Sequence, residues 1–119
     1  MATTVLIVDD HPSFRATARA LLECEGYEVV GEAHDGVSAL AAAAELHPQL
    51  VLLDVQLPDL DGFEVARRLL AQSNGSGPDI VLTSSRDGSD FGPLVAQSGA
   101  RGFVPKAELS GAALAALLA

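Results

Sequence analysis

Carboxylates that directly follow short aliphatic runs are the residues of this chain best suited to chemistry. The run Leu50–Leu53 ends in Asp54, and the run Val5–Val8 ends in the pair Asp9-Asp10. Unalternated aliphatic runs are typical of strands buried on both faces of a parallel sheet. Ligands of open α/β sheets bind at the carboxyl ends of the strands, where an acid can hold a metal ion or act as a nucleophile. The alternative is that Asp54 only begins a turn, because Asp is common where strands stop.

Two further aliphatic runs end in other polar groups. Ile80–Leu82 is followed by Thr83-Ser84-Ser85, and the short run Gly102–Pro105 is followed by Lys106. Alone, such a serine usually caps a turn, and a lone lysine is usually solvated. We therefore base the prediction of a site on the coincidence of these groups at four expected strand ends.

The elements that must position these groups alternate regularly. We expect strands at Val5–Val8, Glu28–Ala33, Leu50–Leu53, Ile80–Leu82 and Gly102–Pro105. We expect helices from Pro12 to a stop at Gly26, over Val37–Leu46, after a cap at Asp61, from near Asp90–Pro93 to about Ser98, and over Leu109–Ala119. This alternation predicts an α/β fold, a five-stranded parallel sheet with helices on both faces. In the flavodoxin-like, doubly wound order 2-1-3-4-5, the first and third strands are neighbours, which brings Asp9, Asp10 and Asp54 together.

Composition limits the class of protein. The 119 residues suit one domain, and the hydrophobic content of 49% argues against disorder. No apolar run is long enough to span a bilayer and no signal peptide is visible, so we expect a soluble protein with no membrane partner. The single Cys24 agrees with a cytoplasmic location. A net charge of -9 disfavours direct binding of nucleic acid by these residues.

Three adjacent carboxylates repel one another unless a cation joins them. Carboxylate oxygens with room for water and phosphate oxygens suit Mg²⁺. The sequence shows no set of zinc ligands, because His11, His34 and His47 lie on separate loops or helix ends. We interpret these histidines as surface residues. With Mg²⁺ bound, an oxygen of Asp54 can attack a phosphoryl group whose other oxygens Lys106 and Ser84 hold.

The chain resembles a known family, the receiver domain of response regulators of bacterial two-component systems, over essentially all of residues 1–119. The motifs that carry the resemblance are Asp9-Asp10, Asp54 with Pro58 and Gly62, Ser84, and Lys106 preceded by Gly99-Ala100 and Gly102-Phe103. The resemblance implies a phosphorylation-activated signalling switch in which a sensor histidine kinase phosphorylates Asp54.

The resemblance also assigns roles to individual residues. It implies that Asp9, Asp10 and Asp54 bind Mg²⁺ with the backbone carbonyl of Gln56, and that Ser84 and Lys106 contact the phosphoryl group. It further implies that Ser84 moves toward the phosphoryl group and that Phe103 changes rotamer. These changes would couple the site to the face made by the fourth helix, fifth strand and fifth helix. Gln56 and Arg86 occupy the positions that tune loss of the phosphoryl group.

Other residues bear on partners. Ala107 after Lys106, together with the stretch Asp10–Arg15, resembles the subfamily whose receivers precede a helix-turn-helix DNA-binding domain. No such output domain lies within residues 1–119, and we expect a receiver cut from a longer regulator that contacts DNA only through that domain. The apolar helix Leu109–Ala119 fits core packing, a homodimer contact or a connection to an output domain.

Two other classes of protein are compatible with an acidic strand end. A phosphatase of the haloacid dehalogenase type also uses a nucleophilic Asp, but it has a second Asp two residues later as general acid, where this chain has Gln56. A binding module that is never phosphorylated would not need to tolerate the repulsion among the acids. We therefore expect a regulatory domain and no enzyme beyond its own phosphorylation and slow dephosphorylation.

Overall fold

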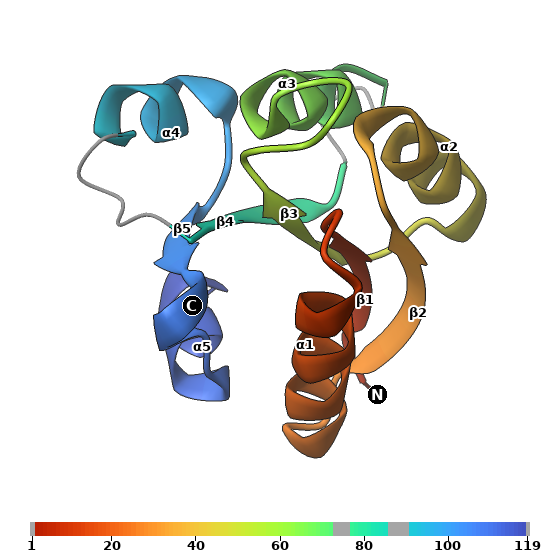
Figure 1. Cartoon of the computed structure of the whole chain (residues 1–119), viewed down its shortest axis with the longest axis vertical. Coiled ribbons are helices and arrows are strands. Elements are labelled where there is room, and N and C mark those ends of the chain that lie inside the picture. Colours follow the sequence, from red (N-terminus) through yellow and green to blue (C-terminus); the bar gives the residue numbers. More distant parts are fainter. Residues whose placement is uncertain (1, 73–76, 86–90, 119) are drawn as a thin grey trace.

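The computed structural model describes residues 2–72, 77–85 and 91–118. The prediction for Arg86, and the expected helix start near Asp90, therefore lie outside the described residues. The sheet has five parallel strands in the order β2-β1-β3-β4-β5, which confirms the predicted topology (Figure 1). The strands are β1 (Thr4–Val8), β2 (Glu28–Ala33), β3 (Leu50–Asp54), β4 (Asp79–Ser84) and β5 (Gly102–Pro105).

Helices cover both faces of the sheet, as the sequence predicts. The helices are α1 (Pro12–Cys24), α2 (Gly36–Leu46), α3 (Gly62–Gln72), α4 (Gly92–Ser98) and α5 (Gly111–Leu118). Figure 1 shows α1 and α5 on one face of the sheet, and α2, α3 and α4 on the other. The strands supply both cores by alternation: Leu6 and Leu53 point to one face and Ile7 and Leu52 to the other.

The central strand β3 is buried along its whole length. Each of its residues from Leu50 to Asp54 is buried, because helices cover both faces of the sheet (Figure 1). The absence of apolar alternation in the sequence has this cause. Its two edges are paired with β1 and β4. Burial on both sides also fixes the register, which places Leu53 opposite Val8 of β1 and Asp54 opposite Thr83 of β4.

Acidic side chains accept hydrogen bonds from backbone N–H groups in the first turns of α2 and α3. Asp61 accepts a hydrogen bond from the backbone N–H of Glu64 at 2.8 Å, which confirms the predicted cap of α3. Asp59, from the loop before α3, accepts from the backbone N–H groups of Gly36 (2.8 Å) and Val37 (3.0 Å). The loop after β3 is thus tied to the first turn of α2, where a negative charge is favourable.

The last helix begins later than the sequence pattern indicates. Residues Lys106–Glu108 form a 3-10 turn, and α5 begins at Gly111. The reason is local: the Ser110 hydroxyl accepts a hydrogen bond from the backbone N–H of Ala113 (3.0 Å), so Ser110 caps this helix. None of the described helices has the length and apolar character that crossing a bilayer requires.

Candidate functional site

The structure brings Asp54 to the carboxyl edge of the sheet, as its last β3 residue. Only 3% of its side chain is exposed. Its Oδ1 accepts a hydrogen bond from the backbone N–H of Gln56 at 3.0 Å, and the next residue continues the pairing through a hydrogen bond from Val55 N–H to the carbonyl of Thr83. Asp54 therefore has a fixed orientation and little contact with solvent.

Asp9 lies on the neighbouring strand end and is fully buried. Its backbone N–H donates to the carbonyl of Ala33 at 3.0 Å, and its carbonyl accepts from the guanidinium of Arg15 at 2.5 Å. Arg15 in turn forms an ion pair with Glu32 of β2 at 3.0 Å. These contacts fix the backbone of Asp9, whereas the following Asp10 is exposed.

Lys106 joins the two buried carboxylates. Its ammonium lies 2.6 Å from Asp9 Oδ2 and 3.1 Å from Asp54 Oδ2, and only 14% of its side chain is exposed. The ammonium also lies 4.6 Å from the centre of the Phe14 ring, within range of a cation–π contact. Side chains at the carboxyl ends of β1, β3 and β5 thus meet at one point.

The charges at this point shift the pKa values of both partners. Burial raises the pKa of the Asp54 carboxyl and the charge of Asp9 adds to this, while the backbone N–H of Gln56 and the ammonium of Lys106 oppose it. Burial acts to lower the pKa of Lys106, but its hydrogen bond to Asp9 and the charge of Asp54 outweigh burial and raise that pKa. Lys106 is therefore a firmly held cation, whereas ionisation of Asp54 is costly.

The other predicted residues occupy positions around this cluster. Ser84 is the buried last residue of β4, directly after the Thr83 that pairs with Asp54. The backbone of Gln56 forms an isolated bridge with Asp61 at the loop after β3. Phe103 lies in β5, and its ring packs against the ring of Phe91, with centroids 5.8 Å apart.

One residue at the site was not predicted from the sequence. His11 lies with its Nδ1 3.0 Å from Asp9 Oδ1 and 3.1 Å from Asp10 Oδ1. Its side chain is 63% exposed, so the interpretation as a surface residue is correct but incomplete. The available signal was its position directly after the acidic pair.

The chain matches a known protein family over nearly its whole length. The family model described as "Response regulator receiver domain" matches residues 5–118. The chain belongs to this family. The receiver domain is 44% identical over 108 residues to BvgA of Bordetella pertussis, whose name describes a positive transcription regulator of virulence factors; the match covers 91% of this chain and 51% of BvgA. It therefore spans about half the length of that curated relative.

Solved structures share the fold over nearly the whole chain. A two-component response regulator of the LuxR family from Aurantimonas sp. SI85-9A1 has a TM-score of 0.86 and 32% identity, with 99% of this chain and 86% of that chain covered. The signal receiver domain of NarL from Mycobacterium tuberculosis has a TM-score of 0.82 and 33% identity, covering 98% and 97%. Both agree with the predicted flavodoxin-like architecture.

The acidic cluster of this receiver domain has the donor chemistry of a divalent metal site. Asp9, Asp10, His11 and Asp54 each offer one ligand atom, and these atoms lie within 4.8 Å of one another. Asp9 and Asp54 are buried and Asp10 is at the surface, so an ion here would contact solvent on one side. Carboxylates with open positions for water fit the coordination that Mg²⁺ prefers.

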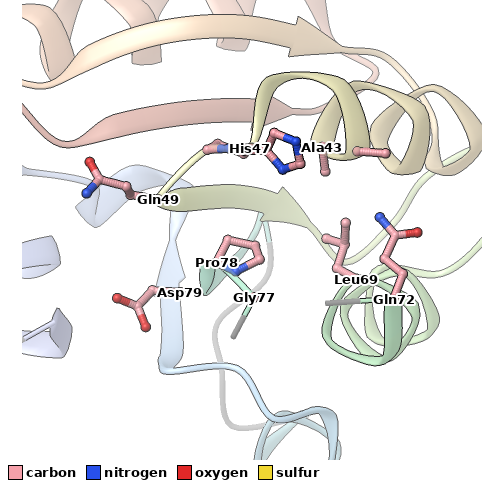
Figure 2. Close-up of a pocket in the computed structure, with 10 residues that line it drawn as sticks. Ala43, His47, Gln49, Leu69, Gln72, Gly77, Pro78 and Asp79 are labelled. Carbon is pink, nitrogen blue, oxygen red and sulfur yellow. The ribbon is translucent and has the colours of Figure 1, made fainter. Parts of the chain in front are cut away.

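A cavity of about 650 Å³ lies at the opposite edge of the sheet (Figure 2). It is lined by the ends of α2 and α3 and by residues that lead into β3 and β4, among them His47, Gln49, Leu69 and Asp79. None of the residues predicted to do chemistry lines it. The candidate site is therefore the charged cluster at the carboxyl edge and not this cavity.

Proposed function

We propose that this receiver domain is a phosphorylation-activated switch that takes a phosphoryl group from a sensor histidine kinase onto Asp54. The observation that carries the proposal is the Lys106 ammonium, held between buried Asp54 and Asp9 at the carboxyl edge of the sheet. A nucleophilic carboxylate next to a fixed cation is the arrangement that phosphoryl transfer requires.

Each residue of the cluster has a part in the proposed transfer. An oxygen of Asp54 attacks phosphorus, the bond from phosphorus to the kinase imidazole breaks, and the imidazole nitrogen keeps the electron pair. Mg²⁺ held by Asp9, Asp10, Asp54 and the backbone carbonyl of Gln56 would neutralise charge on the phosphoryl oxygens. Lys106 and the Ser84 hydroxyl would bind the remaining phosphoryl oxygens.

We further propose that the new phosphoryl charge shifts the face made by α4, β5 and α5. Ser84 would move toward the phosphoryl group, and Phe103 would change rotamer. The contact between Phe103 and Phe91, at the start of α4, supports this route. Because the chain spans about half of its curated relative, we propose that this face controls a helix-turn-helix DNA-binding output domain or a partner, with a homodimer as one such partner.

Two alternatives make different predictions. Gln56 occupies the place of the general acid of haloacid dehalogenase phosphatases, so we expect no turnover of phosphate esters beyond self-dephosphorylation. A module that works only through its surface would not respond to millimolar Mg²⁺. An NMR titration with Mg²⁺ separates this module from the switch, because the switch requires changes at Asp9, Asp10 and Asp54.

Phosphorylation with a small phosphodonor tests the proposal directly. With acetyl phosphate and Mg²⁺, intact-protein mass spectrometry should show one added phosphoryl group on the wild type and none on Asp54→Ala. Asp79→Ala is the matched control, because Asp79 is an exposed carboxylate that begins β4 at the opposite edge of the sheet. A phosphoryl group on Asp54→Ala, or its loss in Asp79→Ala, would contradict the assignment.

A further inference from the structure

We infer that His11 is an additional metal ligand, which makes this site bind later first-row transition-metal ions such as Co²⁺ in preference to Mg²⁺. The inference deepens the proposed function, since it concerns the metal site beside Asp54. It starts from the placement of an imidazole nitrogen between two carboxylates that belong to one acidic cluster.

The spacing of the donor atoms fits one ion. His11 Nδ1 lies 3.0 Å from Asp9 Oδ1 and 3.1 Å from Asp10 Oδ1. Two ligands at right angles, each about 2.1 Å from a common ion, are about 3.0 Å apart. The imidazole nitrogen therefore already has the separation from both carboxylates that neighbouring positions of an octahedron require.

The local backbone holds the imidazole in this place. His11 is the residue before α1, and its side chain makes no capping hydrogen bond to that helix. Its backbone N–H donates to Asp9 Oδ1 at 2.8 Å, which closes a tight turn over the carboxylate. Pro12 then begins the helix, and the clash of its ring Cδ with the preceding residue limits the backbone conformations of His11.

Lys106 does not occupy the carboxylate oxygen that faces His11. The ammonium lies on the other oxygen of Asp9, Oδ2, at 2.6 Å. An ion near Oδ1 of Asp9 and Nδ1 of His11 would thus sit beside the lysine and would not replace it. The exposure of His11 leaves room for water or phosphoryl oxygens in the remaining coordination positions.

The chemical consequence is a change in metal preference. Mg²⁺ binds oxygen ligands and gains little from an imidazole, whereas later first-row transition-metal ions such as Co²⁺ bind nitrogen well. A second histidine provides an internal comparison, because His34 lies 3.4 Å from the single carboxylate of Asp35 and has a similar exposure of 69%. If both histidines only form surface ion pairs, replacing either one should have the same effect on metal preference. If His11 is a ligand, only the replacement of His11 should change that preference.

Metal titrations of the untagged 119-residue chain test the inference. We would measure the Kd of Co²⁺ and of Mg²⁺ by isothermal titration calorimetry for the wild type, His11→Ala and His34→Ala. We expect His11→Ala to lower the preference for Co²⁺ over Mg²⁺ by about tenfold or more, and His34→Ala to leave it unchanged. Pulsed EPR of bound Mn²⁺ should detect one imidazole nitrogen in the wild type and in His34→Ala, and none in His11→Ala.

The possible outcomes separate this inference from the proposed function. An unchanged metal preference in His11→Ala, or a nitrogen signal that persists in it, would overturn the role of His11 even if Asp54 is phosphorylated. A nitrogen signal that depends on His11, in a protein whose Asp54 takes no phosphoryl group, would support the metal ligand and refute the switch. An equal effect of His34→Ala would show surface binding only and would also overturn the inference.

Discussion

Removal of the Asp54 carboxylate should make the metal-free receiver domain more stable at neutral pH. Asp54 is buried, and it shares its surroundings with Asp9 and Asp10. In Asp54→Ala, Lys106 keeps its closer partner Asp9 at 2.6 Å, so no buried cation is left unpaired. The substitution thus removes the charge that repels Asp9 and leaves the Lys106 ammonium paired with Asp9.

The distances give the size of this effect. Charges 4.8 Å apart, the limit within the acidic cluster, repel by about 3 kcal/mol at an effective dielectric of about 20. The repulsion from buried Asp9 offsets more than half of the attraction to Lys106 at 3.1 Å, which is about 5 kcal/mol on the same scale, and the exposed Asp10 adds only a solvent-screened repulsion. Desolvation of the carboxylate adds to the cost, and the lost hydrogen bond from Gln56 subtracts about 1 kcal/mol. We expect the free energy of unfolding to rise by about 1 to 2 kcal/mol.

Urea denaturation in EDTA, followed by circular dichroism, measures the difference and its pH dependence. The folded-state pKa of Asp54 lies above its ordinary value of 3.8, so ionisation of this group destabilises the fold. The gain in the free energy of unfolding of Asp54→Ala should therefore reach its full size above the folded-state pKa of Asp54, and it should shrink as the pH falls toward 4. Saturating Mg²⁺ should also reduce it, because an ion at ten times its Kd stabilises the wild type by about 1.4 kcal/mol.

A neighbouring acid should respond with the opposite sign. Hydrogen bonds from the backbone N–H groups of Gly36 and Val37 lower the pKa of Asp59, so its ionised form stabilises the fold above its unfolded-state pKa. Asp59→Ala should then lower the free energy of unfolding at pH 7. If Asp54→Ala were less stable than the wild type in EDTA at pH 7, or if both variants changed in the same direction, the electrostatic reasoning would be refuted.

Two further substitutions test the charge pairing and the backbone packing around the site. Lys106→Met should lower the free energy of unfolding by about 3 kcal/mol in EDTA, because it leaves Asp9 buried without its cation, and urea denaturation with and without Mg²⁺ would show a partial rescue by the metal. Gly62→Ala should cost about 2 kcal/mol or more in the same assay, because a Cβ there would lie 2.4 Å from the carbonyl oxygen of Asp54. The control Gly92→Ala should be close to neutral, since nothing lies within 4 Å of its added Cβ; equal losses for the two glycines would contradict this explanation.

Most of the fold and the centre of the site could be predicted from the sequence because burial leaves a clear pattern. The run Leu50–Leu53 is unalternated because its side chains enter the cores on both faces of the sheet, and the strand Glu28–Ala33 has the predicted bounds. Parallel strands then place their carboxyl ends on one edge, so the approach of Asp54 and Lys106 follows from topology alone.

The contacts that the sequence did not reveal depend on the direction of single side chains. His11 meets the carboxylates because a turn over Asp9 and a helix beginning at Pro12 aim its ring, and no periodic pattern records such an aim. The late start of α5 had a readable signal in Ser110, a good cap before an apolar run, but Leu109 continues the apolar pattern in front of it.

Lys106 connects the electrostatic cost at Asp54 with the packing of β5. Lys106 is held by Asp9, which directly follows β1, and by Asp54 at the end of β3, but its backbone directly follows β5. A group that changes the charge on Asp54 therefore changes the force on the end of β5, where Phe103 packs against Phe91 of the α4 start. A ligand shifts a conformational equilibrium only by its differential interaction with the two states. A carboxylate that costs about 1 to 2 kcal/mol in the resting state supplies a difference of the size that allosteric coupling requires.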